Sequence, residues 1–324
     1  MAKKTHKSSL LTALEFISLA QRDVGAPYQT HVTLRDKTAV AHDGTLSVGH
    51  LIEEDLIAYP HTLTLLAALR KVEDVLSVTQ LSNMKLAVRS GKFKALVPCV
   101  TDAALPNIRP DPMVGAANNN VREGFKRVVP LVVENSQHVS TSAVFLHSGS
   151  VVATNTKVLL EYWHGIEFDF ELLLPKLFVD AVIKITKNII GYGFSPNTFT
   201  LYFEDSSWIK TQVYVDKYLN YGKILNVQSN QQPIPTDFFK ALNTVHAFAP
   251  DYRVWLKNGY VSTSANDYVG ATFEVSDLNT NVVCNIRHLL LLEDFVTTFD
   301  FAGVNNVSHF FGENIRGAMS HFKG

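Results

Sequence analysis

The chain has 324 residues, of which 46% are hydrophobic and 18% charged, and its formal net charge is −1. It contains no apolar run near the roughly 18 residues of a membrane-spanning helix, and its basic start lacks the continuous apolar core of a signal peptide. The only cysteines, Cys99 and Cys284, are too few for a disulfide framework or a zinc site, which indicates a reducing cytoplasm. No cofactor is expected.

A short motif recurs three times along the chain. Residues 38–48, 143–153 and 253–263 each read as an apolar strand, a two-residue turn ending in glycine, and a second strand. Glycine accepts the positive φ that a tight hairpin requires. The three turn glycines, Gly44, Gly149 and Gly259, are spaced by 105 and 110 residues. Such even spacing predicts a triplicated domain.

Each copy of the motif has the same predicted neighbours in chain order. A helix precedes it, at residues 9–22, from residue 122, and from residue 235 to a stop at Pro250. A third strand follows, at 55–59, 158–163 and 268–275 in the three copies. A second helix comes after it, at 61–72, 176–187 and 288–296. Closing strands complete each unit, at 76–80, 85–88 and 93–97, at 189–193, 199–203 and 208–215, and at 307–311 and 315–322. This order predicts an α+β fold with mostly antiparallel sheets, abbreviated after Gly303.

Two stretches have the composition of linkers: residues 105–120 are rich in proline, glycine and asparagine, and residues 226–235 in glutamine, asparagine and proline. They divide the chain into three predicted domains, at 1–115, 116–227 and 228–324. Pro130 falls where the first helix of the second domain should still be running. Because proline removes a backbone donor and clashes with the preceding turn, a kink or a shortened helix is expected there.

This arrangement resembles the bacterial DNA polymerase sliding clamp. The strings at residues 43–48, 88–93, 125–128 and 152–155, the last followed by Leu159, are similar to that family in the same order. The resemblance implies three α+β domains per chain and a homodimer closed head to tail into a ring, with helices lining a pore and sheets outside. It also implies double-stranded DNA, DNA polymerase and a clamp loader as partners, the two proteins docking through short apolar peptides.

If the helices line a pore, their basic residues would face DNA phosphates without reading sequence. The alternative is that these side chains are solvated helix faces. The pairs Lys126-Arg127 and Arg70-Lys71 fall at similar places in successive repeats, which favours the pore. The candidate DNA-binding residues are Arg22, Arg70, Lys71, Arg122, Lys126, Arg127, Lys184, Lys187 and Lys240.

The resemblance also places a partner-peptide pocket between the second and third domains. Two positions depart from the family, because Thr156-Lys157-Val158 replaces the usual Gly-His-Arg and Leu219 replaces a proline. These departures predict a different peptide, as in a phage clamp working with its own polymerase in the host cytoplasm. For Leu159, Ile224 and Met319, the alternative is ordinary core. The candidate pocket residues are Thr154, Thr156, Lys157, Leu159, Leu219, Lys223, Ile224, Met319 and Phe322.

Enzyme signatures are weak in this sequence. Ser90-Gly91-Lys92 lacks the other residues of a phosphate loop. His147 and His164 could meet, but isolated histidines on strands are more typical of structural positions than of ligands. Glu167, Asp169 and Glu171 alternate with apolar residues, which predicts one face of a strand and an acidic outer sheet. Together with these weak signatures, the resemblance to sliding clamps implies a processivity factor with no catalytic activity. The alternatives are a non-encircling replication or repair accessory protein and, less favoured, a hydrolase using the carboxylate row.

Overall fold

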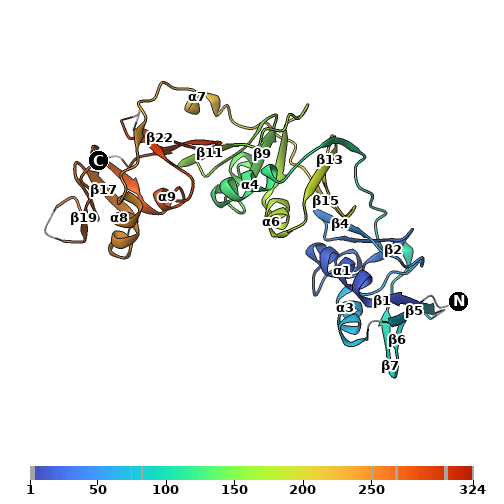
Figure 1. Ribbon diagram of the computed structural model, residues 1–324. Helices are drawn as coiled ribbons and strands as arrows, with labels where there is room; N and C mark the ends of the chain where they lie inside the picture. The colour runs from blue at the N-terminus through green and yellow to red at the C-terminus, as the bar shows by residue number, and fades with distance from the viewer. Residues whose placement is uncertain are drawn as a thin grey trace. The chain divides into compact units, whose positions relative to one another are not determined.

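The computed structural model describes residues 4–73, 75–81, 83–249, 251–266, 269–302 and 306–322 (Figure 1). The chain divides into two compact units. The first combines Met1–Asn119 with Leu177–Tyr214, and the second combines Asn120–Lys176 with Val215–Gly324. All the strand pairs within the sheets are antiparallel, and every sheet lies within one unit.

The first unit holds a four-stranded and a seven-stranded sheet. The four-stranded sheet has the order β1 (Lys4–His6), β5 (Val75–Leu81), β6 (Lys85–Ser90), β7 (Phe93–Pro98). The seven-stranded sheet has the order β2 (Thr33–Arg35), β3 (Thr38–His42), β4 (Leu46–Leu51), β15 (Trp208–Gln212), β14 (Thr198–Phe203), β13 (Ile189–Ser195), β8 (Met113–Ala116). The helices are α1 (Lys7–Ile17), α2 (Pro27–Thr30), α3 (Thr62–Lys71) and, beyond its first residue, α6 (Lys176–Lys184).

The second unit holds an eight-stranded and a four-stranded sheet. The eight-stranded sheet has the order β12 (Leu172–Pro175), β9 (Ala143–His147), β10 (Ser150–Thr154), β11 (Val158–Trp163), β23 (Ile315–Ser320), β22 (Val307–Gly312), β21 (Thr298–Asp300), β16 (Gln232–Pro233). The four-stranded sheet has the order β19 (Thr272–Glu274), β18 (Tyr260–Ser262), β17 (Arg253–Lys257), β20 (Val282–Asn285). The helices are α4 (Asn120–Val128), α5 (Val139–Ser142), α7 (Gly222–Leu225), α8 (Phe238–Val245) and α9 (Ile286–Leu290).

The order of elements recurs three times. A leading strand (β1, β8, β16) and a helix (α1, α4, α8) are followed by a three-stranded meander (β2–β4, β9–β11, β17–β19). In the second and third copies a further strand (β12, β20) pairs with the first strand of the meander. A second helix (α3, α6, α9) then leads into three more strands, the first of which pairs with the leading strand. The last strand of one repeat continues the meander of the repeat before it, because β15 pairs with β4 and β23 pairs with β11. The predicted α+β fold with antiparallel sheets is confirmed.

The sequence matched the hairpin at Gly44 with the hairpins at Gly149 and Gly259, and this match is wrong for the first copy of the repeat. All three predicted hairpins exist, and Gly44, Gly149 and Gly259 have φ of 110°, 78° and 84°. However, the counterpart of β9–β10 is β2–β3, whose turn is made by Asp36 and Lys37 with φ of 53° and 54°. No glycine marks that turn in the sequence. In the following hairpin the Asp43 N–H donates to the Leu46 carbonyl at 3.0 Å, so Gly44 opens the turn instead of ending it.

Most of the other predicted elements are present. The helix predicted at 61–72 is α3, with His61 and Val72 as its caps, and the strand predicted at 158–163 is β11. The shortened helix at Pro130 is confirmed: α4 ends at Val128 and continues as a 3-10 helix over Val129–Leu131. Further 3-10 helices are Ser18–Ala20, Asp102–Ala104 and His246–Phe248.

Several predicted boundaries are wrong. Residues 55–59 form no strand, and only an isolated bridge joins Ala58 to Leu34, next to Pro60, which cannot donate to a ladder. The helix predicted from residue 235 is α8, which begins at Phe238. The helix predicted at 288–296 is α9, which begins at Ile286 because the Asn285 side chain accepts hydrogen bonds from the N–H groups of the first turn. The strand predicted at 268–275 is reduced to β19. The predictions made for Pro250, Tyr268 and Gly303 lie outside the described residues.

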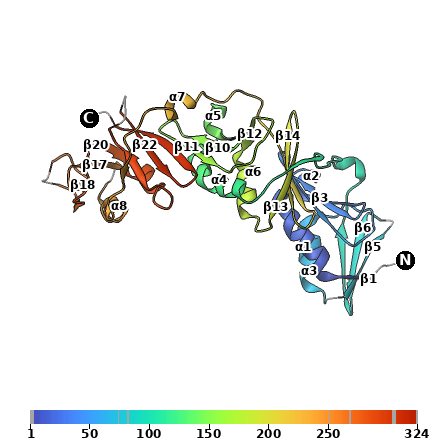
Figure 2. The same cartoon turned by 45° about the horizontal axis from the view of Figure 1, so that its top comes forward.

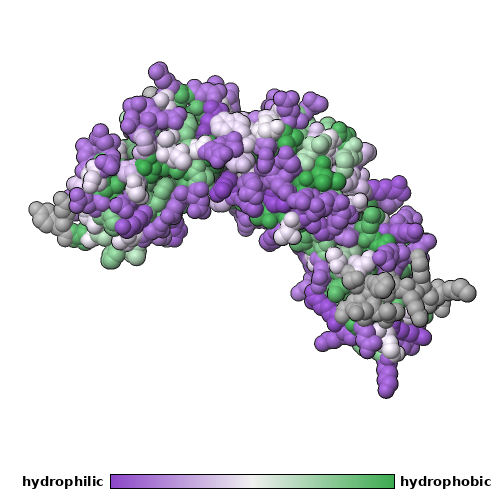
Figure 3. All heavy atoms as spheres, in the orientation of Figure 1, coloured by the Kyte–Doolittle hydropathy of each residue, from purple (hydrophilic) through white to green (hydrophobic). Residues whose placement is uncertain are grey.

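Helix α1 packs on the first unit's larger sheet. α1 contacts β3 and β4 and lies beside α3, as Figure 2 also shows. The contact is apolar, since Leu10, Leu14 and Leu69 are fully buried. No helix in the described ranges is long and apolar enough to cross a membrane. Hydrophilic residues are spread over both units on the face seen in Figure 3. Cys284 is fully buried, and this burial raises the pKa of its thiol to about 12, whereas Cys99 is half-buried.

Candidate functional site

The candidate cations of the first unit differ in how they are held. Arg70 and Lys71 end α3 and Lys184 ends α6, all exposed, while Arg22 lies beyond α1 in an exposed loop. The Arg70 guanidinium is 3.2 Å from Glu15, in a pair that water reaches on both sides. Surface pairs of this kind contribute at most about 1 kcal/mol, so phosphate can compete for the arginine.

Lys187 is held more tightly than the other candidate lysines. Its Nζ lies 2.5 Å from Asp205 Oδ2, 3.3 Å from Ser207 Oγ and 3.9 Å from the centre of the Phe16 ring. Burial raises the pKa of Asp205, but hydrogen bonds from Lys187 and Ser207 outweigh it and lower that pKa to about 2. A lysine with this ion pair and ring contact is a structural residue in the first instance, and a phosphate contact would have to displace its partners.

The candidate cations of the second unit also differ in accessibility. Arg122 on α4 is only 7% exposed, and this burial lowers the pKa of its guanidinium, so it is poorly placed for a phosphate. Lys126 is paired with Glu123 at 2.7 Å and Lys240 with Asp237 at 3.3 Å, both as exposed pairs one helical turn apart. The Arg127 guanidinium lies 5.1 Å from the centre of the Phe295 ring. The accessible cations here are therefore Lys126, Arg127 and Lys240.

The candidate peptide site is built on the adjacent strands β10, β11 and β23. Thr154 is paired with Leu159, Val158 with Met319, and Leu159 with Ala318. The turn between β10 and β11 is closed by the Thr154 hydroxyl, which donates to the Val158 carbonyl at 2.7 Å, and Thr156 takes a φ of 72°. Thr156 and Lys157 are exposed at its tip. Strand pairing therefore brings Thr154–Leu159 and Met319 together.

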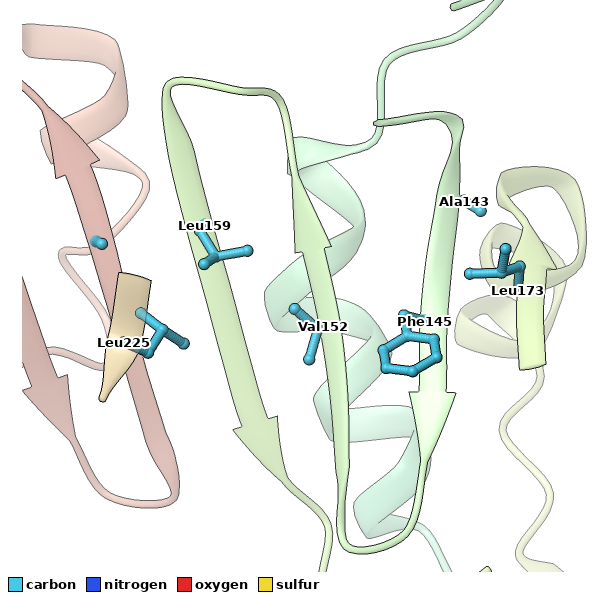
Figure 4. Close-up of a cluster of buried hydrophobic side chains, with 7 residues drawn as sticks. Ala143, Phe145, Val152, Leu159, Leu173 and Leu225 are labelled. Atoms are coloured by element: carbon cyan, nitrogen blue, oxygen red, sulfur yellow. The ribbon is translucent and has the colours of Figure 1, made fainter. Parts of the chain in front are cut away.

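Two of these residues belong to the core. Leu159 is 4% exposed and Met319 is fully buried. Leu159 lies in an apolar cluster, shown in Figure 4, in which Phe145, Val152 and Leu159 lie on neighbouring strands and Leu225 of α7 comes toward Leu159. The sequence left open whether these residues line a peptide pocket or belong to the ordinary core, and the burial of Leu159 and Met319 fits the core. These two side chains can shape a site from beneath, but they present little surface to a partner.

The segment around α7 supplies the exposed part of this site. The Ile224 carbonyl lies 3.0 Å from His309 Nε2, which ties α7 to β22, and the Ile224 side chain is 40% exposed. Leu219 is half-buried and Lys223 exposed. Tyr218 stacks on Phe145 at 4.6 Å between ring centres. Within the described residues its buried hydroxyl has no hydrogen-bond partner, and burial raises the pKa of this hydroxyl.

Phe322 lies in different surroundings. Its N–H donates to the Val283 carbonyl at 2.9 Å, and the Arg253 guanidinium stands 5.0 Å from the centre of its ring. These contacts attach it to β17 and β20, in the four-stranded sheet. Phe322 is thus placed on a different sheet from the strands that carry Thr154, Leu159 and Met319.

Sequence reasoning missed a buried polar network next to the site. Glu161, 3% exposed, accepts hydrogen bonds from Ser150 (2.9 Å), Tyr221 (3.1 Å) and Arg316 (2.7 Å). His147 Nε2 lies 2.7 Å from both hydroxyl oxygens. Burial lowers the pKa of His147, although Glu161 opposes this shift. The one feature of the sequence that could have indicated this network is Glu161, a carboxylate within the apolar residues of β11. Because Ser150 is 1% exposed, the Ser–His contact is closed to a substrate.

The predicted carboxylate row is not on a strand. Residues 164–171 are irregular, and Phe168 and Phe170 stack on each other at 4.9 Å. Glu167, Asp169 and Glu171 are exposed, as expected for an acidic surface. Among the described residues, no group of three His, Cys, Asp or Glu side chains could hold a metal ion.

The fold matches solved structures over its whole length. The DNA polymerase III β subunit of Pseudomonas aeruginosa superposes with a TM-score of 0.85 at 12% identity, and the sliding clamp of Caulobacter crescentus with 0.84 at 14%, each covering 100% of both chains. The Helicobacter pylori β clamp bound to a DNA ligase peptide gives 0.80 at 15%, again covering both chains fully. No protein-family model and no curated protein sequence matches the chain. The predicted sliding-clamp fold is confirmed.

Proposed function

We propose that this chain, which has the sliding-clamp fold over its full length, is a DNA polymerase processivity factor that encircles duplex DNA and carries out no reaction. The full-length match to bacterial clamps carries this proposal. The threefold order of elements supports three domains, with the first boundary before β8 instead of at residue 115. Two chains would then supply six domains for a closed ring, with a two-fold axis relating the two contacts.

In this ring, cations contact the phosphates without reading bases. The candidates that the structure leaves accessible are Arg22, Arg70, Lys71, Lys126, Arg127, Lys184 and Lys240. Several of them are in weak exposed ion pairs, which suits transient contacts with a sliding duplex. Arg122 and Lys187 would serve the fold instead.

Topological holding predicts a specific dependence on the form of the DNA. After loading, the wild-type protein should remain on nicked circular duplex in moderate salt and leave the same DNA once it is linearised. Ordinary phosphate contacts are lost steeply with rising salt on both forms. The measurement is protein retained with DNA after gel filtration, at rising salt, for circle and linear DNA. Light scattering on the free protein should give roughly twice the chain mass, as the homodimer requires.

A charge variant separates loading from holding. Replacing Arg70, Lys71, Lys126 and Lys184 by glutamine should weaken direct DNA contact and loading while leaving the dimer intact. The matched control replaces the exposed Lys85, Lys92, Lys94 and Lys217, which are outside the candidate set. Equal release of wild-type protein from circles and linear DNA would contradict encirclement and favour a non-encircling accessory protein.

We further propose that short apolar peptides of the polymerase and the clamp loader bind beside α7, over the turn at Thr154–Lys157. The Helicobacter pylori clamp bound to a DNA ligase peptide supports peptide binding on this fold. The exposed Ile224 side chain provides an apolar surface at this place. An apolar peptide side chain would contact Ile224, with the buried Leu159 and Met319 supporting the surface from below.

The variant Ile224→Asp should lower the affinity for such a peptide by about tenfold or more, because it puts a charge on the apolar surface. Leu159→Asp is unsuitable, since it would bury a charge in the core. The probes are fluorescently labelled peptides copied from short apolar segments of the cognate polymerase and loader, and their binding is followed by fluorescence anisotropy. Ile190→Asp, equally exposed in the first unit, is the control. Unchanged affinity in Ile224→Asp would place the peptide site elsewhere.

A further inference from the structure

A hollow of about 460 Å³ lies in the first unit, in a place that the proposed DNA and peptide contacts do not use. It is lined by parts of β2, β3 and β4, by the start of β15 and by the segment before β8. In β3, Ala39 and Ala41 are buried and α1 packs on this strand, so the alternate residues Thr38 and Val40 point to the opposite face. The hollow is therefore on the sheet face away from α1. We refer to it as the Trp208 hollow.

The Trp208 hollow has an apolar floor and an apolar rim. Trp208 is paired with Gly49 on β4, and a Cβ at Gly49 would lie 2.2 Å from Trp208 Cε2. Only a glycine lets the indole lie this close to the neighbouring strand. Trp208 itself is 5% exposed, whereas the rim residues Leu51 and Ile57 are 50% and 59% exposed. Large aliphatic side chains so exposed around one hollow are typical of a binding surface.

Two arginines line the same hollow. The Arg35 guanidinium is 3.2 Å from Asp102 and also donates to the Tyr59 hydroxyl, so its position is fixed. Arg109 is exposed and, within the described residues, forms no ion pair.

The carboxylate nearest to Arg109 in sequence, Asp111, is already engaged. Asp111 accepts hydrogen bonds from Lys210 at 2.8 Å and from Thr198 and Thr200 at 2.8 and 2.9 Å. Among the described residues that line the hollow, Asp36, at the turn between β2 and β3, is the one acidic side chain, against two arginines. The lining therefore has a cation, Arg109, that a carboxylate from outside could pair with.

We propose that the Trp208 hollow docks a short extended segment of a partner protein, in which a carboxylate stands beside an aliphatic or aromatic side chain. The apolar side chain would enter between Leu51 and Ile57 above Trp208. The carboxylate would pair with Arg109, and Thr33, Thr38 and Asn107 in the lining offer hydrogen-bonding groups to the segment's main chain. The volume suits a few side chains and is at the small end for ligand sites. This site shares no residue with the one beside α7.

The test is a selection of displayed random hexapeptides on the full chain, with the peptides that bind then synthesised with a fluorescent label. We expect a group of peptides that combine Asp or Glu with a large apolar residue. Their affinity should fall by about tenfold or more in Ile57→Asp and in Arg109→Glu, and stay unchanged in Ile224→Asp. Both substituted side chains are exposed, so the fold should survive, as thermal unfolding would check.

A charge reversal makes the assignment specific. Exchanging the peptide carboxylate for lysine should restore binding to Arg109→Glu and abolish it with the wild-type chain. If no selected peptide loses affinity in Ile57→Asp and Arg109→Glu, the proposal is wrong. The same two variants should retain wild-type behaviour on circular DNA, so failure of this docking site and failure of the clamp function are distinguishable.

Discussion

Replacing Glu161 by alanine is expected to lower the free energy of unfolding by about 3 kcal/mol or more. Glu161 is buried and accepts hydrogen bonds from Ser150 of β10, from Tyr221 just before α7 and from Arg316 of β23. Its removal leaves the partly buried Arg316 guanidinium without its counter-charge and, among the described residues, His147 Nε2 as the one remaining nearby acceptor for two hydroxyls. Breaking a buried ion pair from one side costs about 3–5 kcal/mol because the remaining charge is uncompensated.

Urea unfolding at neutral pH measures this loss, and hydrogen exchange of the β11 and β23 amides shows where it acts. Amide exchange is useful because a chain of two compact units need not unfold in one step. Glu167→Ala, an exposed carboxylate in the next loop, is the matched control and should change stability by less than about 0.5 kcal/mol. Adding Arg316→Ala to Glu161→Ala should recover part of the loss. Equal stability of the Glu161 and Glu167 variants would contradict the network's role.

Acid is expected to destabilise the protein between pH 6.5 and about pH 4 through His164. This side chain is 2% exposed, and burial lowers its pKa from 6.5 to about 4. Between these values the unfolded chain binds a proton that the folded chain does not, so stability falls as the pH falls through this window. At about 1.4 kcal/mol per unit of pKa, the loss is roughly 3 kcal/mol by pH 4. Burial also lowers the pKa values of His31, His42, His147, His288 and His321, which adds to the effect.

The measurement is urea unfolding at pH 7, 6, 5 and 4.5, for the wild type and His164→Asn. Asparagine can still accept the Ile166 N–H that now donates to His164 Nδ1 at 3.0 Å, but it does not titrate. The variant should therefore show a smaller loss of stability with falling pH. His138→Asn, at an exposed histidine, should keep the wild-type dependence. Identical pH dependence in His164→Asn and the wild type would exclude His164 as the cause.

The sequence by itself determined the features that depend on a few neighbouring residues. The three glycine turns, the short α4 before Pro130 and the boundaries of α3 and β11 follow from local backbone preferences and hydrophobic periodicity. The clamp-like order of elements could also be predicted, because each helix and strand in it is specified by a short stretch of sequence. The triplicated order was therefore predictable, although β2–β3 escaped notice because Asp36 and Lys37 form its turn without a glycine.

The tertiary structure alone decided what each candidate residue is available to do. Leu159 and Met319 are core, Arg122 is buried, and Lys187 is engaged by Asp205 and Phe16, yet nothing in their immediate sequence separates them from the exposed Ile224, Lys71 and Lys184. The Glu161 network and the Trp208 hollow likewise join residues more than 100 positions apart, such as Glu161 with Arg316 and Gly49 with Trp208. Burial and ion pairing are set by which strands pair across repeats, and this pairing depends on contacts that periodicity along one segment does not encode.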